Sequence, residues 1–298
     1  MATLPPLRET PYRPRSRYGR TWLYNGLYGD RKMIIVLDAL NRDRFGDLEQ
    51  EMFRLRARVF QDRLGWDVTV RDGLEMDAFD ALDPAHVISL DESGHVVGCM
   101  RLLQTTGPHM LADVFAEILG GEPPLRSPHI WEATRFCVDT ERLSGTGRAR
   151  NSISYVTSEV MVGAFEYGRD AGVTDAVAVI DPVMNRVMNR SGNAPYDYIG
   201  KTVDMGKVNA LAALLDCSDE RIDRIRAFAG IEGDVFLSED EALDLISTHA
   251  APPPEKSALE IYCDEQIAAA TNAKERVAAL KLKAALTDKI RSHSQVGA

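Results

Sequence analysis

Hydrophobic and polar residues follow two patterns along this chain: short apolar runs, and longer segments with an apolar residue every three or four positions. Segments of the two kinds alternate along the sequence. Short runs of apolar, mostly β-branched residues predict strands. The predicted strands are 33–37, 86–90, 96–103, 130–138, 176–180, 196–203 and 208–215. Longer segments with apolar residues every three or four positions predict helices at 43–65, 152–170, 183–190, 220–228, 239–248 and 257–290. Strands that alternate with helices predict a mixed, twisted α/β sheet flanked by helices.

Charged residues interrupt several of these apolar segments. In the first predicted helix one stripe is apolar, and Arg56 and Phe60 lie one turn apart on the adjoining stripe. The apolar stripe consists of Leu48, Met52, Leu55 and Val59. Arg101 lies inside the second strand of a predicted hairpin, and Glu132 and Arg135 lie inside the next strand. Because a buried charge needs an opposite charge or a polar ligand, we expect these side chains to converge.

Composition narrows the class of protein. With 298 residues, 45% of them hydrophobic, the chain can build a substantial core. Its four cysteines form no CxxC pair and no secretory segment precedes them, so we expect a cytoplasmic protein without disulfides or a metal site. No apolar run approaches the roughly 20 residues of a membrane span. The net charge of −10 argues against a nucleic-acid binder.

Changes in composition divide the chain into three parts. Residues 1–32 carry seven Lys or Arg and two acidic residues, and form either a solvated tail or a docking arm for an acidic partner. A folded domain is expected over 33–230. Residues 231–298 are rich in Ala, Glu and Lys at helical spacing, which predicts a helical extension.

Eight charged and aromatic positions stand at characteristic offsets. They are Arg56, Phe60, Trp66, Asp77, Asp80, Arg101, Glu132 and Arg135. This set resembles the signature of the acyl-homoserine-lactone synthases, the bacterial autoinducer synthase family, over about residues 33 to 230. The resemblance implies an acyltransferase with a GNAT-like fold that takes S-adenosylmethionine as a substrate, needs no cofactor, and receives its acyl chain from acyl-carrier protein. It further implies lactone closure with release of methylthioadenosine, and thus a quorum-sensing signal as product.

The residue types fit that substrate. Asp77 and Asp80 suit the ammonium and sulfonium, arginines can clamp the carboxylate, and Trp66 and Phe60 offer aromatic faces to the adenine or the sulfonium. A purely structural ion-pair cluster of Arg56, Asp77, Asp80 and Arg101 is the alternative hypothesis, and both roles can coexist.

Glu132 is the predicted base that takes the proton of the ammonium group, with Arg135 beside it in the catalytic set. The alternative for Glu132 is a salt bridge to Arg101 or Arg135. Backbone N–H groups near Thr134 to Phe136 are the expected oxyanion donors. Since Glu132 and Arg135 are three residues apart, either a bulge realigns them or they serve different surfaces of the strand.

The expected acyl pocket lies between the later strands and the long helix. Its predicted members are Val160, Met161, Ala178, Val179 and Met184. Family members that prefer 3-oxo chains often carry threonine where this chain has Ala178, so the resemblance predicts an acyl chain without a 3-oxo group.

Arg186 and Arg190 lie on one face of a short helix and predict a docking patch for acidic acyl-carrier protein, which Lys201 and Lys207 could extend. A solvated helix face is the alternative. Two other functions stay open: the same reaction with acyl-CoA as donor, and a non-catalytic GNAT-like binding module.

Overall fold

The computed structural model describes residues 32–144, 153–206 and 208–249, together with residues 267, 269–270, 274–278 and 280–281. Residues 1–31, Lys207 and most of the helix predicted at 257–290 lie outside the described residues. The chain divides into one compact unit that ends at Ile246 and a second unit from Ser247 onward, and the second unit is helical in most of its described residues.

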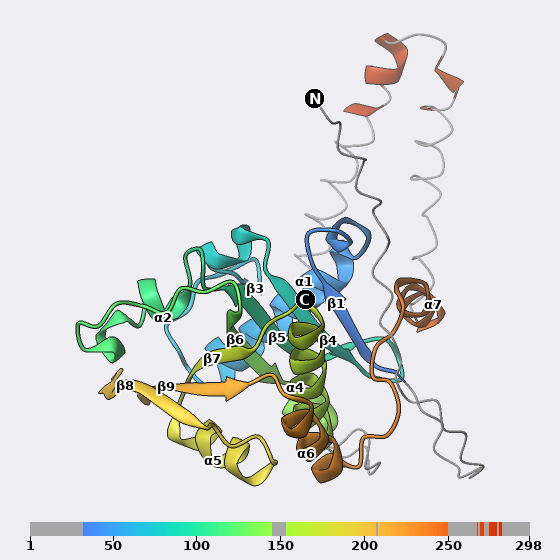
Figure 1. Ribbon diagram of the computed structural model, residues 1–298. Helices are drawn as coiled ribbons and strands as arrows, with labels where there is room; N and C mark the ends of the chain where they lie inside the picture. The colour runs from blue at the N-terminus through green and yellow to red at the C-terminus, as the bar shows by residue number, and fades with distance from the viewer. Residues whose placement is uncertain are drawn as a thin grey trace, which may run out of the picture. The chain divides into compact units, whose positions relative to one another are not determined.

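A seven-stranded sheet forms the frame of the first unit (Figure 1). Its strands, in spatial order, are β1 (Ile34–Leu37), β4 (Ala85–Leu90), β5 (Val96–Gln104), β6 (Ile130–Val138), β7 (Asp175–Ile180), β9 (Asn209–Asp216) and β8 (Asp197–Asp204). All neighbours are antiparallel except β6 and β7, which run parallel. The predicted mixed sheet is confirmed. A separate hairpin of β2 (Val70–Arg71) and β3 (Leu74–Glu75) follows the first helix.

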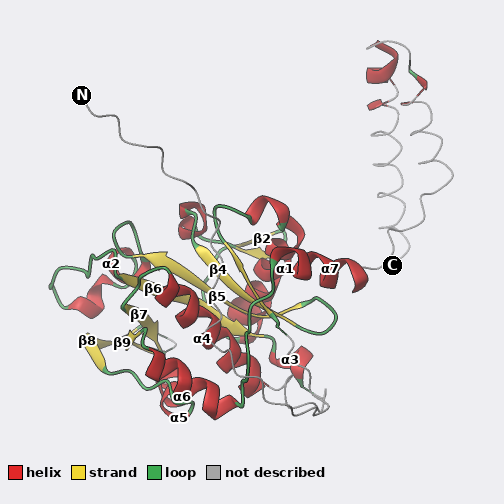
Figure 2. Cartoon of the chain, turned by 45° about the vertical axis from the view of Figure 1, so that its right-hand side comes forward, coloured by secondary structure: helices red, strands yellow, loops and turns green. Residues whose placement is uncertain are grey.

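Helices cover both faces of the sheet. On one face α1 (Gly46–Arg56) continues into a π-helical turn, η2 (Ala57–Arg63), which the sequence pattern did not distinguish from a regular helix. On the other face α4 (Ile153–Asp170) and α6 (Asp219–Ala229) lie side by side (Figure 2). The remaining helices are α2 (Met110–Asp113), α3 (Thr140–Leu143), α5 (Pro182–Arg190), α7 (Glu239–His249), and the 3₁₀ turns η1 (Arg42–Arg44), η3 (Ala78–Leu82) and η4 (Ala116–Leu119). Among the described residues, no helix has both the length and the apolar character that a bilayer crossing requires.

Strand alternation decides which residues meet which helix. Cys99 packs in the core beneath α1, whereas Met100 and Leu102 pack in the core beneath α4. The stripe predicted for the first helix is buried against the α1 face. Arg101 therefore projects, with Cys99, toward α1.

The centre of the sheet opens between two strands. β6 and β7 pair only from Ile130 to Glu132, opposite residues 175–177, although both strands continue. Past Glu132 they separate, so the backbone of Thr134 to Phe136 lies beside this opening.

The segment after α6 crosses from one face of the sheet to the other along the edge of β1. The Ile34 N–H donates to Val235 O at 2.8 Å, and the Leu237 N–H donates to Ile34 O at 2.7 Å. Further on, Ala242 of α7 is fully buried in the core beneath α1. Residues 235–237 thus occupy the outer edge of the sheet.

Candidate active site

Three arginines and three carboxylates interlock on the α1 face of the sheet. We call this set the ion cluster: Arg56, Arg101 and Arg135 with Glu75, Asp77 and Asp80. The six residues come from α1, β3, the N-cap and body of η3, β5 and β6. Five of them were predicted site residues, and the structure brings all five together.

Arg56 is held from two sides. Its Nε donates to Glu75 Oε2 at 2.6 Å, and its Nη1 and Nη2 donate to the two oxygens of Asp80 at 2.8 and 2.9 Å. Such fork-to-fork pairing fixes the planes of both groups. Asp80 is itself fixed by a capping box at η3, because its Oδ2 accepts from the Asp77 N–H at 2.9 Å while Asp77 accepts from the Phe79 N–H.

Arg101 joins the same carboxylates from β5. Its Nη1 donates to Asp77 Oδ1 at 2.6 Å and to Asp80 Oδ1 at 2.8 Å, and its Nη2 donates to Asp77 Oδ2 at 3.0 Å. Its Nε donates to Thr134 Oγ1 at 3.0 Å. Arg56 and Arg101 both have 0% exposure, so neither touches solvent directly.

A β-bulge carries Arg135 into the cluster. Arg101 pairs with Thr134 in register, but the next pair is Cys99 with Cys137, so two residues of β6 face one residue of β5. Arg135 adopts a φ of +52° there. Its Nε donates to Glu75 Oε1 at 3.1 Å, and its Nη2 lies 2.7 Å from Asp77 Oδ2. Of the two arrangements left open by the sequence, the bulge is the one present.

Charge pairing controls the protonation of the cluster. Burial alone would raise the pKa of Asp80, but contacts with His86, Arg56 and Arg101 hold it far below its usual value. The pKa of Asp77 is lowered in the same way, against the effect of burial, by Arg101 and Arg135. Burial lowers the pKa of His86 despite its neighbour Asp80. The cluster thus pairs three arginines with three carboxylates.

Two aromatic rings border the cluster. Phe60 of η2 and Trp66 stack with centroids 5.2 Å apart and planes 15° from parallel. The Arg135 guanidinium lies over the Phe60 ring at 5.6 Å from its centroid. Phe60 and Trp66, both predicted site residues, thus adjoin the part of the cluster that contains Arg135.

Glu132 lies nearby but forms no ion pair with Arg101 or Arg135 in the described part of the chain. Its Oε2 accepts from the Met110 N–H and its Oε1 from the Leu111 N–H, both at 2.6 Å, so the salt-bridge alternative is wrong. Burial raises the pKa of Glu132 to about 7, although these N–H groups and Arg101 oppose the shift. A carboxyl with this pKa changes charge near neutral pH.

Sequence reasoning missed two residues of this region. Glu75 is fully buried and bridges Arg56 and Arg135. A charged residue between Leu74 and Met76 was the available signal for it. The Met110 Sδ lies 3.3 Å from Arg101 Nη2 and 3.5 Å from Arg135 Nη1, and nothing in the local pattern marks that contact.

The predicted acyl-pocket residues divide between the two faces of the sheet. Val160, Met161, Ala178 and Met184 gather in the core beneath α4, and Phe136 packs against the same core. Val179 packs instead with the core that contains residues of α2 and η4, because side chains alternate along β7. The expectation that Val179 shares a pocket with the other four is therefore wrong.

The predicted docking patch lies on the surface. Arg186 and Arg190 of α5 are exposed and one turn apart, and Lys201 of β8 is exposed as well. Val183 and Val187 lie on the same helix with 58% and 36% exposure. α5 thus presents cations and apolar side chains to solvent.

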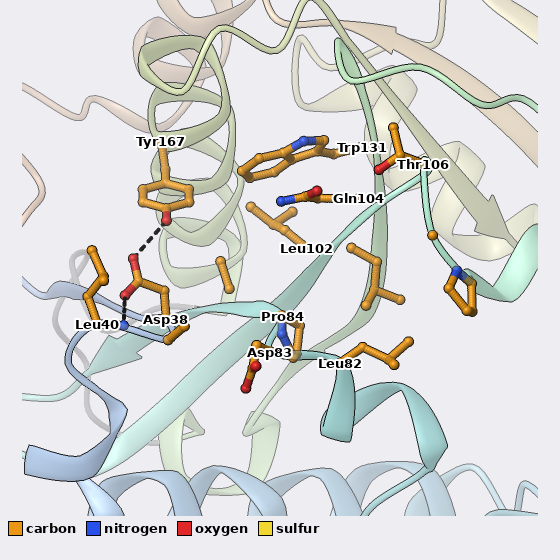
Figure 3. A pocket seen from close by; sticks show the side chains of 15 residues that line it. Asp38, Leu40, Leu82, Asp83, Pro84, Leu102, Gln104, Thr106, Trp131 and Tyr167 are labelled. Carbon is orange, nitrogen blue, oxygen red and sulfur yellow. Dashed lines mark hydrogen bonds between the residues drawn. The ribbon is translucent and has the colours of Figure 1, made fainter. Parts of the chain in front are cut away.

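A cavity of about 590 Å³ lies elsewhere, at the ends of β1, β5 and the start of β6 (Figure 3). Trp131 and Tyr167 line it, and the Tyr167 hydroxyl donates to Asp38 Oδ2 at 3.0 Å. None of the predicted site residues lines this cavity, and Leu102 on its wall belongs to the α4 face. The cavity and the ion cluster are separate features.

Known proteins are similar to this chain in sequence and in fold. The family model described as autoinducer synthase matches residues 41–225. The acyl-homoserine-lactone synthase of Aeromonas hydrophila is 36% identical over 194 residues, which are 64% of this chain and 91% of that protein. The solved structure of MesI, a CoA-dependent acyl-homoserine lactone synthase, aligns with a TM-score of 0.59 and 27% identity over 68% of this chain and 98% of its own. TofI, solved in a ternary complex with an inhibitor and MTA, aligns with a TM-score of 0.53 and 25% identity over 67% of this chain and 97% of its own. The expected GNAT-like fold is confirmed.

Proposed function

This chain belongs to the autoinducer synthase family and is an acyl-homoserine-lactone synthase, and we propose that it acylates the α-amine of S-adenosylmethionine. Lactone closure then expels methylthioadenosine. The observation that carries this proposal is the ion cluster with its stacked aromatic pair, because S-adenosylmethionine presents a carboxylate, two cations and a planar base. TofI, a solved neighbour, binds MTA.

Access divides the cluster into contact residues and supporting residues. The side chains of Arg135 and Asp77 are 12% and 18% exposed, so they can meet a ligand at the surface of the cluster. Arg56 and Asp80 are buried behind them and hold their positions. Trp66 is half-buried and stacks on the Phe60 ring, which lies beside the Arg135 guanidinium. This division lets the structural and binding roles of the cluster coexist.

Glu132 is the proposed base. The substrate ammonium must lose a proton before its nitrogen attacks the acyl carbonyl, and a carboxyl with a pKa of about 7 accepts that proton at neutral pH. The attack creates an oxyanion, and backbone N–H groups of Thr134 to Phe136, beside the opening between β6 and β7, are the proposed donors to it.

Acyl-carrier protein is the proposed acyl donor. Its acidic surface would meet Arg186 and Arg190, and the exposed Val183 and Val187 of the same helix would adjoin that contact. Acyl-CoA is the second candidate, because the neighbour MesI is CoA-dependent. Ala178, which lies on the α4 face and has no hydroxyl, supports an acyl chain without a 3-oxo group.

The reaction is proposed to take place in the cytoplasm. Cys99, Cys137 and Cys217 are free and buried, which fits a reducing compartment. Within the described residues, Cys99 and Cys137 lie with their sulfurs 3.4 Å apart as thiols.

One experiment tests the reaction and the donor together. Purified protein is incubated with S-adenosylmethionine and matched panels of acyl-carrier-protein and acyl-CoA thioesters, and products are identified by mass spectrometry. We expect N-acyl-homoserine lactone with acyl-carrier-protein donors. Asp77→Asn should abolish product formation, whereas Asp83→Asn should not, because Asp83 is exposed at the other end of η3 and pairs with Arg42. A wild-type protein that releases no methylthioadenosine with any donor would refute the proposal.

A further inference from the structure

Met110 contacts the two arginines through its side chain and Glu132 through its backbone. The thioether Sδ lies 3.3 Å from Arg101 Nη2 and 3.5 Å from Arg135 Nη1. The Met110 N–H donates to Glu132 Oε2 at 2.6 Å. No other described side chain outside the ion cluster accepts from both arginines.

The thioether is the weakest acceptor that these arginines have. Arg101 donates elsewhere to the carboxylates of Asp77 and Asp80 and to the Thr134 hydroxyl, and Arg135 donates to Glu75. A thioether sulfur accepts a hydrogen bond far less strongly than an oxygen does. An incoming anion would therefore displace Met110 before any carboxylate of the cluster.

Burial leads to the same conclusion. Arg101 has 0% exposure and Met110 has 6%, so a ligand cannot reach Arg101 Nη2 while the Met110 side chain stays in place. The cluster already pairs three arginines with three carboxylates. A ligand that brings a carboxylate together with positive charge can bind there without leaving the site with a large net charge.

The backbone and the side chain of Met110 have different freedom. The backbone is anchored, since the N–H groups of Met110 and Leu111 both donate to the Glu132 carboxylate. The side chain has three rotatable bonds and no branch, so it can turn aside without movement of α2.

We propose that the Met110 side chain occupies the carboxylate subsite of the substrate and is displaced from Arg101 and Arg135 when S-adenosylmethionine binds. This rests on the proposed function for the identity of the substrate. Met110 is thus a positioning residue: it satisfies two guanidinium N–H groups in the empty enzyme and yields them to the substrate carboxylate. The displacement of Met110 therefore reduces the net free energy with which the substrate carboxylate binds.

Two substitutions at Met110 give opposite predictions. Met110→Leu keeps the volume but removes the acceptor, so the substrate carboxylate no longer competes with it. Met110→Gln supplies an amide oxygen, which is a stronger competitor than sulfur. We expect S-adenosylmethionine to bind about two- to fivefold more tightly to Met110→Leu than to wild type, and to bind Met110→Gln more weakly by at least the same factor. This is the range that one neutral hydrogen bond provides.

Isothermal titration calorimetry measures both changes without turnover. Decarboxylated S-adenosylmethionine is the matched ligand, and its affinity should be the same for wild type, Met110→Leu and Met110→Gln. Met52→Leu, a fully buried methionine of α1, is the matched protein control and should change neither affinity. Thermal melting identifies any variant that does not fold, and either Met110 variant alone still gives a signed prediction.

The outcomes separate the two proposals. Shifts of the same sign in both Met110 variants, or equal shifts for the decarboxylated ligand, would mean that Met110 only packs and would overturn the inference. If wild-type protein forms product normally while the variants bind like Met52→Leu, the inference fails and the proposed function stands. If wild-type protein does not bind S-adenosylmethionine at all, both fail.

Discussion

Glu75→Gln tests whether the ion cluster is as dry and as tightly paired as its geometry indicates. The Glu75 carboxylate is fully buried and binds Arg56 Nε at 2.6 Å and Arg135 Nε at 3.1 Å. The substitution keeps the shape of the side chain but removes one negative charge. Three arginines then face two carboxylates, and the change lies at a position that solvent does not reach, because Glu75 and Arg56 are both 0% exposed.

The expected loss follows from the burial of the unpaired charge. Removing one partner of a buried ion pair costs about 3 to 5 kcal/mol, and the remaining amide oxygen still accepts from one arginine, so we expect about 3 kcal/mol. For a domain of this size that is a fall of roughly 6 to 12 °C in Tm. Because Arg135 loses an anchor, kcat/KM for S-adenosylmethionine should fall by roughly ten- to a hundredfold at temperatures where the variant is folded.

Circular dichroism melting and product assays measure the two effects on the same samples. Glu51→Gln is the matched control, because Glu51, on α1, is likewise a paired glutamate, with His95 at 3.3 Å, but its side chain is 29% exposed. We expect it to cost less than about 1 kcal/mol. If Glu75→Gln melts at the same temperature as Glu51→Gln, the cluster is screened by water and the argument from burial is wrong.

Three further predictions concern the chemistry, the donor and the fold. The kcat should rise with pH through an inflection near 7, because only ionised Glu132 accepts the proton. Glu132→Gln should remove this inflection and lower kcat by about 10²- to 10⁴-fold, with a smaller effect on the melting temperature. Reversing the charges of Arg186 and Arg190 to Glu should raise KM for acyl-carrier protein about tenfold and leave KM for S-adenosylmethionine unchanged. Gly200→Ala should be poorly folded, since φ is +66° and a Cβ would lie 2.0 Å from a carbonyl oxygen of η4. Gly73 has a φ of +76° but lies in open space, so Gly73→Ala should lower the free energy of unfolding in urea by only about 1 kcal/mol.

Each of these has a result that would contradict it. A pH profile without an inflection between about 6 and 8 would exclude Glu132 as the base whose ionisation limits the rate. Equal changes in both Michaelis constants would mean that the charge reversal disturbs the fold rather than a docking surface. Similar stability of the two glycine variants would mean that η4 moves away from β8 at little cost.

Local periodicity was sufficient to predict the helices and strands, but not the irregularities within them, such as the bulge in β6. The strand at 130–138 was predicted with the bounds that β6 has, because apolar alternation depends only on neighbouring residues. The side that Arg135 faces could not be predicted in the same way. It depends on the pairing of Cys99 with Cys137 across the bulge, which is a relation between strands.

The two missed site residues share a physical reason. Glu75 meets Arg135 sixty positions along the chain, and Met110 meets Arg135 twenty-five positions away. Their roles come from contacts that form only when the sheet assembles. Resemblance to the family identified five members of the ion cluster, whereas the geometry adds the partner that holds Arg56 and Arg135 and the neutral acceptor that lies between Arg101 and Arg135.

The pairing of residues 235–237 with β1 has a practical consequence for anyone who shortens this protein. A chain cut at residue 230, where the composition changes, would lose the carbonyl that receives the Ile34 N–H and the N–H that Ile34 O receives. The bared amides and carbonyls of β1 would then be open to a strand from another molecule, which is a common route to aggregation. A C-terminal boundary placed after α7 retains residues 235–237 and so keeps the outer edge of β1 paired.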